Sequence, residues 1–111
     1  MIILPYPPSA NRYWRTFRGQ VVKSDEARKY QESAGDAARA AGAQMLDGDV
    51  AITLRVYRPQ RRGDLDNRIK VLLDSMQGIL FEDDAQVREI HAYLDDDRHA
   101  PRVEIEITEA E

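Results

Sequence analysis

The feature that most constrains this chain is the alternation of side chains in residues 50–57. Apolar side chains occupy every second position of the segment: Val50, Ile52, Leu54 and Val56. Because successive side chains of a strand point to opposite sides, this pattern predicts a strand with one buried face. A half-buried strand needs partner strands and a covering layer, so the chain must build a sheet packed against other elements.

Two segments with helical periodicity flank this strand. Ser24, followed by Asp25 and Glu26, is typical of a helix start, because a hydroxyl caps the first turn and acids favour the positive end of the dipole. We expect this helix to end at residues 41–43. After the strand, apolar residues recur at the spacing of a second helix that stops near Gly78: Leu65, Ile69, Leu72, Leu73 and Met76.

The remaining segments complete an α/β (α+β) pattern. Three further strands are predicted, the last with an edge-like pattern: residues 1–4, 87–94 and 103–107. Residues 10–23 indicate a mixed loop or ragged hairpin that turns at Gly19, and residues 94–98 a solvated hairpin tip. The expected fold is a single domain over residues 1–111, with one mixed sheet of about four strands and two helices in the order β-α-β-α-β-β.

Composition excludes several classes of site. The chain has no cysteine, which excludes disulfides, thiolate metal sites and cysteine nucleophiles. Its start lacks a basic segment followed by a long apolar run, so we expect no signal peptide. No apolar stretch approaches the roughly 20 residues of a membrane span, so we expect no membrane partner and a cytoplasmic location.

Charge is distributed unevenly along the chain. The formal net charge is -4, but residues 1–70 hold 13 Lys and Arg against 8 Asp and Glu, whereas residues 71–111 hold 3 against 12. The basic part suits contact with phosphates. Uneven charge is also common in small acidic domains, so charge alone leaves a nucleic-acid partner undecided.

Acidic residues recur at the start and after the end of the second predicted helix. Asp64 and Asp66 in "RRGDLDNRIK" would project to the same side of an extended segment, where both could reach one cation. A returning strand could bring Asp83 and Asp84 of the following connector close to them, and converging carboxylates are the usual ligands of Mg²⁺. Alternatively, Asp66 caps the helix and pairs with Lys70 at i,i+4, while the later acids are solvated turn residues.

Two neighbours of these acids could take part in chemistry. A helix that begins near Asn67 points Lys70 back toward the carboxylates, where its ammonium could contact a phosphate. Asn67 itself could orient a carboxylate or a water molecule by hydrogen bonding.

Cationic side chains on both sides of the first helix are candidate DNA ligands. In residues 10–23 they interleave with aromatic rings that could stack on unpaired bases, although at least one ring is expected to pack against the protein. The cationic side chains beside the acids would contact the DNA backbone, unless they belong to a solvated loop. The candidates are Arg12, Arg15, Arg18, Lys23, Arg58, Arg61 and Arg62.

Three segments together carry a resemblance to a known family. They are "LPYPPSANRYWRTFRGQVVKSDEARKY", "RRGDLDNRIK" and "LFEDDAQV", in this order along the chain. In combination they resemble the RusA-type Holliday junction resolvases (crossover junction endodeoxyribonucleases), small endonucleases of bacteria and their prophages, over nearly the whole chain. The segment "RRG" is less basic than the family's arginine run, which implies a weaker affinity for junctions.

The resemblance implies roles for the site residues. It assigns catalysis and Mg²⁺ coordination to Asp64, Asp66 and Asp84, with Asp83 as a further candidate ligand. Lys70 takes the place of the family's functional lysine, and Mn²⁺ is expected to be able to replace Mg²⁺. The resemblance also implies a homodimer that resolves four-way junction DNA by symmetric paired nicks in recombination and repair, without a small-molecule cofactor.

Two other functions fit the residues alone. The same aspartates could serve a metal-dependent hydrolase of nucleotides or other phosphoesters. If the acids only cap helices, the chain could be a non-catalytic DNA-binding module. The basic and aromatic segment at residues 10–23 favours a polymer substrate over a small molecule.

Overall fold

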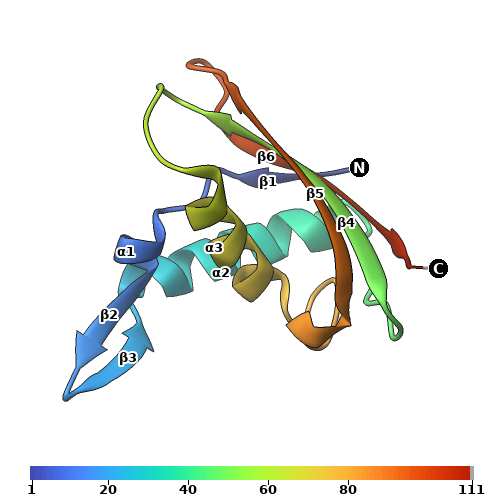
Figure 1. The fold of residues 1–111 in the computed structure, drawn as a ribbon, viewed down its shortest axis with the longest axis horizontal. Coiled ribbons are helices and arrows are strands. Elements are labelled where there is room, and N and C mark those ends of the chain that lie inside the picture. Colours follow the sequence, from blue (N-terminus) through green and yellow to red (C-terminus); the bar gives the residue numbers. More distant parts are fainter. Residues whose placement is uncertain (111) are drawn as a thin grey trace.

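The computed structural model describes residues 1–110 and shows one mixed sheet with helices packed on one of its faces (Figure 1). A two-stranded hairpin projects away from this sheet. The predicted order β-α-β-α-β-β is confirmed for the main elements. The elements are β1 (Ile2–Pro5), α1 (Ala10–Tyr13), β2 (Trp14–Phe17), β3 (Gln20–Lys23), α2 (Asp25–Ala40), β4 (Val50–Arg58), α3 (Leu65–Met76), the 3-10 helix η1 (Asp84–Gln86), β5 (Val87–Asp96) and β6 (Arg102–Glu109).

The segment predicted as a mixed loop or ragged hairpin contains α1 and the hairpin β2–β3. The hairpin turns at Arg18 and Gly19, whose φ angles are 51° and 75°. Glycine adopts this left-handed region without a steric penalty, so the turn predicted at Gly19 is confirmed. The four-residue helix α1 is too short for its periodicity to show in the sequence.

The sheet has the strand order β1-β6-β4-β5. β4 and β5 are parallel, with α3 in the crossover between them, whereas β6 is antiparallel to both β1 and β4. The expectation that residues 103–107 form an edge strand is therefore wrong, because β6 lies between two strands. Alternation reports which face of a strand is buried and carries no information about its neighbours.

The core lies between the sheet and the two long helices. α3 contributes branched side chains such as Leu72, and α2 contributes small ones such as Ala34. The predicted buried face of β4 is confirmed, with 0% exposure at Val50, Ile52, Leu54 and Val56. Each fully buried aliphatic side chain stabilises the fold by about 1.5–3 kcal/mol.

Within residues 1–110, no helix is long and apolar enough to cross a membrane.

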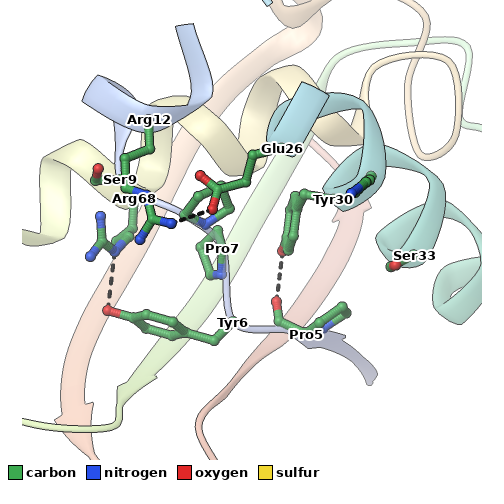
Figure 2. Close-up of a pocket in the computed structure, with 11 residues that line it drawn as sticks. Pro5, Tyr6, Pro7, Ser9, Arg12, Glu26, Tyr30, Ser33 and Arg68 are labelled. Carbon is green, nitrogen blue, oxygen red and sulfur yellow. Dashed lines mark hydrogen bonds and ion pairs between the residues drawn. The ribbon is translucent and has the colours of Figure 1, made fainter. Parts of the chain in front are cut away.

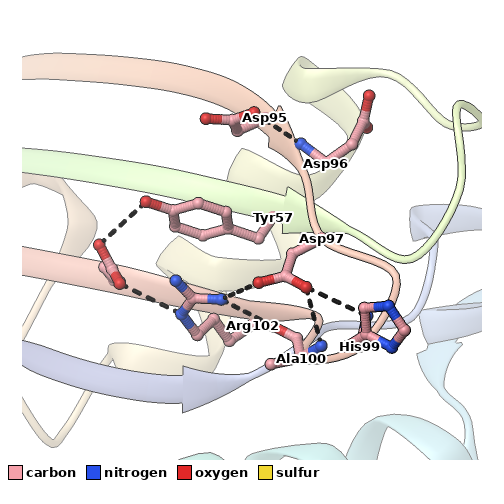
Figure 3. Close-up of polar contacts among 8 residues, drawn as sticks. Tyr57, Asp95, Asp96, Asp97, His99, Ala100 and Arg102 are labelled. Atoms are coloured by element: carbon pink, nitrogen blue, oxygen red, sulfur yellow. Dashed lines mark hydrogen bonds and ion pairs between the residues drawn. The ribbon is translucent and has the colours of Figure 1, made fainter.

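The connection between β5 and β6 is a structured turn at the end of the sheet (Figure 3). β5 and β6 lie on opposite sides of β4, so the chain crosses the end of β4, where the backbone N–H of Asp97 donates to the carbonyl of Arg58 at 2.7 Å. The Asp97 carboxylate accepts hydrogen bonds from the backbone N–H groups of His99 and Ala100 at 3.1 and 3.0 Å. The expectation of a hairpin tip is therefore wrong, because β5 and β6 do not pair with each other, although Asp95, Asp96 and Arg98 are exposed as expected.

Arg102 joins this turn to the open face of the sheet (Figure 3). Its Nη1 donates to Asp97 Oδ2 at 2.9 Å, its Nε donates to Glu104 at 3.1 Å, and its guanidinium lies 3.9 Å from the centre of the Tyr57 ring. The backbone N–H of Ala100, and then Arg102, hold the pKa of Asp97 below its usual range. The hydrogen bond to Asp97 in turn raises the pKa of Arg102.

Candidate active site

Asp64 and Asp66 lie where the chain leaves the loop after β4 and enters α3. Asp64 occupies the N-cap position, so the expectation that Asp66 is the cap is wrong, yet the Asp64 side chain makes no capping hydrogen bond. Asp66 Oδ1 accepts a hydrogen bond from the backbone N–H of Asn67 at 2.9 Å. Both acids are exposed, and neither forms an ion pair with any residue in the described range 1–110, Lys70 included. Two neighbouring carboxylates without a countercharge favour binding of a cation.

Asn67 positions α1 beside these acids. Its Oδ1 accepts a hydrogen bond from the backbone N–H of Ala10, the first residue of α1, at 2.5 Å. The first backbone donors of a helix lack partners within that helix, so this bond satisfies one of them. Asn67 therefore fixes where the segment that begins at Ala10 starts.

Tyr13 and Asp74 fasten the base of the hairpin to α3. Tyr13 is fully buried, and its Oη donates to Asp74 Oδ2 at 2.5 Å. Burial, and then the hydrogen bond to Asp74, raise the pKa of Tyr13 far above its usual value, so the phenol stays protonated. Lys23 Nζ lies 3.0 Å from the same Asp74 oxygen. Lys23, predicted as a DNA ligand, is thus engaged within the protein.

The exposed end of the hairpin presents a cationic and aromatic surface. The guanidinium groups of Arg15 and Arg18 lie over the Phe17 ring, 5.3 and 5.2 Å from its centre, and Phe17 is 49% exposed. Trp14 is half-buried and packs edge-on against the ring of Tyr13, with 4.7 Å between ring centres, so the expectation that one ring packs inward is confirmed. Phe17 is the ring left available for stacking on a base.

Lys70 of α3 lies on the side of the helix that faces this hairpin. It is exposed and lines a hollow of about 340 Å³ that Trp14 and Arg15 also line. On a helix, residues four apart share a face, so Lys70 lies on the same side of α3 as Asp66. The arrangement places a lysine on the side of α3 that faces the hairpin.

A second, larger cavity of about 470 Å³ opens on the other side of α1 (Figure 2). Arg68 lines it, donates from Nε to the Tyr6 hydroxyl at 3.1 Å and lies 5.2 Å from the centre of the Tyr6 ring. Arg12 also lines it and pairs with Glu26 at 2.6 Å. Arg12, Lys29 and Arg68 all line this cavity. Spacing along the chain does not indicate that they form one basic group, because they are far apart in the sequence.

The arginines before Asp64 divide into two kinds. Arg58 has only 15% of its side chain exposed, and it bonds Asp96 Oδ1 at 2.8 Å and the carbonyl of Gly63 at 3.0 Å. Arg58 was expected to contact DNA, but its guanidinium instead holds the loop before α3 against the end of β5. Arg61 and Arg62 are exposed on that loop and remain candidate DNA ligands.

The second acidic motif is built into a capping box. Asp83 Oδ1 accepts a hydrogen bond from the backbone N–H of Ala85 at 2.9 Å. Gln86 Oε1 accepts from the backbone N–H groups of Glu82 and Asp83, and its Nε2 donates to the carbonyls of Leu46 and Gly48. Asp83 is therefore engaged in the local structure. Asp84 is exposed at the first position of η1.

The two acidic motifs lie at opposite ends of α3 (Figure 1). The 12 residues of α3 span about 18 Å, far more than one metal ion can bridge. No group of three or more His, Asp or Glu side chains that could hold a metal ion occurs in residues 1–110. Asp84 is thus not brought to Asp64 and Asp66 within one chain. The cause is the crossover, which carries the chain back along the sheet before the parallel strand β5 begins.

Comparison with known proteins identifies the family. A model of the family described as Endodeoxyribonuclease RusA matches residues 5–108. The chain belongs to this family. Among its RusA relatives is the crossover junction endodeoxyribonuclease of Enterobacteria phage HK97, which is 37% identical over 115 residues, covering 98% of this chain and 93% of the phage protein. The RusA proteins of Enterobacteria phage 82 and Escherichia coli K12 are each 36% identical over 114 residues, covering 97% of this chain and 92% of theirs.

The RusA match spans both ends of α3. It includes the hairpin, the acids at the start of α3 and the capping box before β5. The resemblance stated from the sequence is therefore confirmed at the level of the family.

Proposed function

We propose that the protein is a metal-dependent endonuclease that cuts four-way DNA junctions in the bacterial cytoplasm, as a homodimer acting in recombination and repair. The observation that carries this proposal is the pair Asp64 and Asp66, exposed and without an ion-pair partner in residues 1–110, at the α3 end that adjoins the cationic hairpin. The names of the relatives, crossover junction endodeoxyribonuclease, support the junction as substrate.

The acids fit a divalent cation by their donor chemistry. Mg²⁺ prefers carboxylate and water oxygens, and one carboxylate oxygen of Asp66 accepts only a local backbone hydrogen bond. We propose that Asp64 and Asp66 hold Mg²⁺, with Mn²⁺ able to replace it, and that Asp84 can join them only from the other subunit of the homodimer. Once bound, the ion would activate a water molecule as the nucleophile and neutralise phosphate charge.

Other side chains would hold the DNA. Lys70 stands where its ammonium can contact a phosphate oxygen next to the acids. Phe17 is exposed for stacking on an unpaired base at the junction centre. Exposed arginines of the hairpin and of the loop before α3 would contact the DNA backbone, which makes affinity sensitive to salt: Arg15, Arg18, Arg61 and Arg62.

One assay separates the proposal from its alternatives. Purified protein is incubated with a labelled four-way junction, a linear duplex and free nucleotides, with and without Mg²⁺. Paired nicks in the junction alone support the proposal. Hydrolysis of nucleotides would instead support a phosphoester hydrolase, and junction binding without cutting in any divalent metal would support a DNA-binding module.

Asp66→Asn tests the acid pair directly. We expect junction cutting to fall at least about 10²-fold, because loss of an outer-shell partner alone reaches that level in metal sites. Junction binding, measured by gel shift in Ca²⁺, should survive. Asp25→Asn is the matched control, since Asp25 is likewise an exposed acid in the first turn of a helix, on α2. Normal cutting by Asp66→Asn would contradict the proposed site.

A further inference from the structure

The cavity of about 470 Å³ is lined by residues that have no part in the proposed active site (Figure 2). Its walls come from the segment that joins β1 to α1, from α2 and from Arg68 of α3. Within residues 1–110 it shares no lining residue with the hollow beside Lys70. Cavities that bind small organic ligands usually have volumes of about 300–1,000 Å³, so this cavity has room for such a molecule.

The cavity is positively charged, although the chain has a net charge of -4. Arg12, Lys29 and Arg68 line it, and Glu26 is the one acid among the described residues that do so. Arg12 pairs with Glu26, whereas neither Lys29 nor Arg68 forms an ion pair with another residue in the range 1–110. A concave surface with an excess of cations attracts an anion.

Arg68 is held in place by the protein itself. Its Nε donates to the Tyr6 hydroxyl at 3.1 Å, and its guanidinium lies 5.2 Å from the centre of the Tyr6 ring. It also lies against Gly63, where an added Cβ atom would be only 2.8 Å from Nη2. In the described part of the chain the bond to Tyr6 is its one hydrogen bond. The Nη groups are therefore left to donate to an anion, and the fork of donors in arginine matches the oxygens of a phosphate.

The wall beside Arg68 is rigid and apolar. Pro5, Pro7 and Pro8 line the cavity, and their rings fix the φ angles of this segment. Tyr30 anchors the segment, because its hydroxyl donates to the carbonyl of Pro5 at 2.7 Å (Figure 2). A preformed apolar wall beside fixed cations suits a ligand that combines a flat ring with a phosphate.

Two serine hydroxyl groups complete the lining. Ser9 precedes α1 at its N-cap position, but its side chain makes no capping hydrogen bond. Ser33 is exposed on α2. A hydroxyl group both donates and accepts, so the two serines can bond to the sugar or to the polar edge of a base.

We infer that this cavity binds a single nucleotide, with its phosphate at Lys29 and Arg68 and its base against the proline wall. The nucleotide is either free or part of a DNA strand, because both present the same phosphate and base. The site does not include Asp64 or Asp66, so it goes beyond the proposed endonuclease and stands without it.

Titration with a nucleotide tests the site. Amide chemical shifts of the isotope-labelled protein are followed as deoxyadenosine monophosphate, deoxyadenosine or inorganic phosphate is added at millimolar concentration without a divalent metal. We expect the monophosphate to shift the amides of Tyr6, Ser9 and Lys29. Deoxyadenosine and inorganic phosphate should each bind at least about tenfold more weakly, because each lacks one half of the ligand. No shift at these amides, or equal affinity for inorganic phosphate, would overturn the assignment.

Removal of charge tests the phosphate contact. Lys29→Gln and Arg68→Gln should each weaken binding of the monophosphate about tenfold or more, because each removes a hydrogen-bond donor that carries a charge. Arg39→Gln is the matched control, since Arg39 is an exposed cation of α2 outside the cavity. Lys29 is exposed and unpaired within residues 1–110, so Lys29→Gln gives an answer even if Arg68→Gln fails to fold. Unchanged affinity in Lys29→Gln would overturn the proposed contact.

Junction binding distinguishes the two sources of the nucleotide. Gel shifts of a four-way junction in Ca²⁺ are measured at several salt concentrations for the wild type, Lys29→Gln and Arg39→Gln. If the nucleotide belongs to the DNA, Lys29→Gln alone lowers junction affinity and reduces the slope of log affinity against log salt by about 0.7–0.9. If the nucleotide is free, Lys29→Gln leaves junction affinity unchanged and weakens only the binding of the monophosphate.

The nucleotide site and the proposed function can fail separately. A wild-type protein that does not cut junctions overturns the proposed function, while the titration still decides whether the cavity binds a nucleotide. A protein that cuts junctions but shows no shift at Tyr6, Ser9 and Lys29 overturns the nucleotide site and leaves the endonuclease proposal standing.

Discussion

The two ends of α3 use the same kinds of residue for different purposes. At its start, Asp64 and Asp66 make few contacts within the protein and lie beside exposed cations. After its end, Asp83 is engaged in a capping box, and Phe81 is fully buried. We propose that the start binds a ligand, whereas the finish holds the local structure together. Asp84 at the finish is exposed at the first position of η1.

Phe81→Ala, after the end of α3, should cause the largest loss of stability. Phe81 is 0% exposed, and its carbonyl accepts a hydrogen bond from the N–H of Gly78 at 2.7 Å. Removing a buried phenyl ring leaves a cavity, so we expect the free energy of unfolding to fall by about 3–5 kcal/mol. Urea denaturation followed by circular dichroism measures the change.

Phe17→Ala is the control for this prediction. Phe17 is the only other phenylalanine in the chain and is 49% exposed, so its removal should cost well under about 1 kcal/mol of stability. Its effect should appear in junction binding instead, where loss of a stacked base costs about 1–3 kcal/mol. Equal losses of stability in the two variants would show that the ends do not differ in this way.

Gln86→Ala should produce the next largest loss of stability. Gln86 makes four hydrogen bonds to backbone groups, including 2.7 Å to the carbonyl of Gly48 and 2.8 Å to the N–H of Glu82. At about 1 kcal/mol for each bond, less what exposed groups regain from water, we expect a loss of about 2 kcal/mol. Hydrogen exchange at the amides of Glu82 and Asp83 should accelerate. Gln44→Ala, at an exposed glutamine outside the capping box, should change neither quantity.

The parts of the fold that follow from local patterns could be predicted from the sequence. The Ser24 cap is confirmed, since its Oγ accepts a hydrogen bond from the N–H of Ala27 at 3.1 Å. The buried face of β4 and the extent of α3 follow from periodicity, which needs only neighbouring residues. The position of β6 between β1 and β4 depends on pairing between distant segments, and alternation along β6 holds no record of its partners.

The candidate site shows the same limit. The pattern of acids and cations marks Asp64, Asp66 and Lys70 as candidates. The structure places the two acids at the start of α3 and Lys70 in the middle of the same helix. The expected convergence with Asp84 depends on the direction in which β5 returns, which residue spacing does not specify. Arg58 illustrates the converse, because a basic residue beside the acids turns out to bond Asp96 within the protein.

Asn67→Ala tests how much the hydrogen bond between Asn67 and α1 contributes to stability. The substitution leaves the backbone N–H of Ala10 without its acceptor, which should cost about 1–2 kcal/mol of stability. Asn67→Asp keeps an acceptor oxygen and should retain most of it. Thermal denaturation of the two variants measures the difference. If they lose the same stability, the hydrogen bond to α1 contributes nothing, and other contacts, such as those of Tyr13 and Lys23 with Asp74, position the hairpin.

Asp97→Asn gives the smallest expected effect, at the edge of the sheet where α3 starts. Its hydrogen bonds lower the pKa of Asp97 in the folded state, so its ionised form stabilises the protein above its unfolded pKa, near 3.9. This contribution is lost as pH falls through the lower, folded value. The wild type should therefore melt at a higher temperature than Asp97→Asn at pH 7, and the difference should shrink below about pH 4. Asp47→Asn, at an exposed acid, is the control. A difference that stays constant from pH 7 to pH 3 would mean that the turn is held by its backbone geometry rather than by the charge of Asp97.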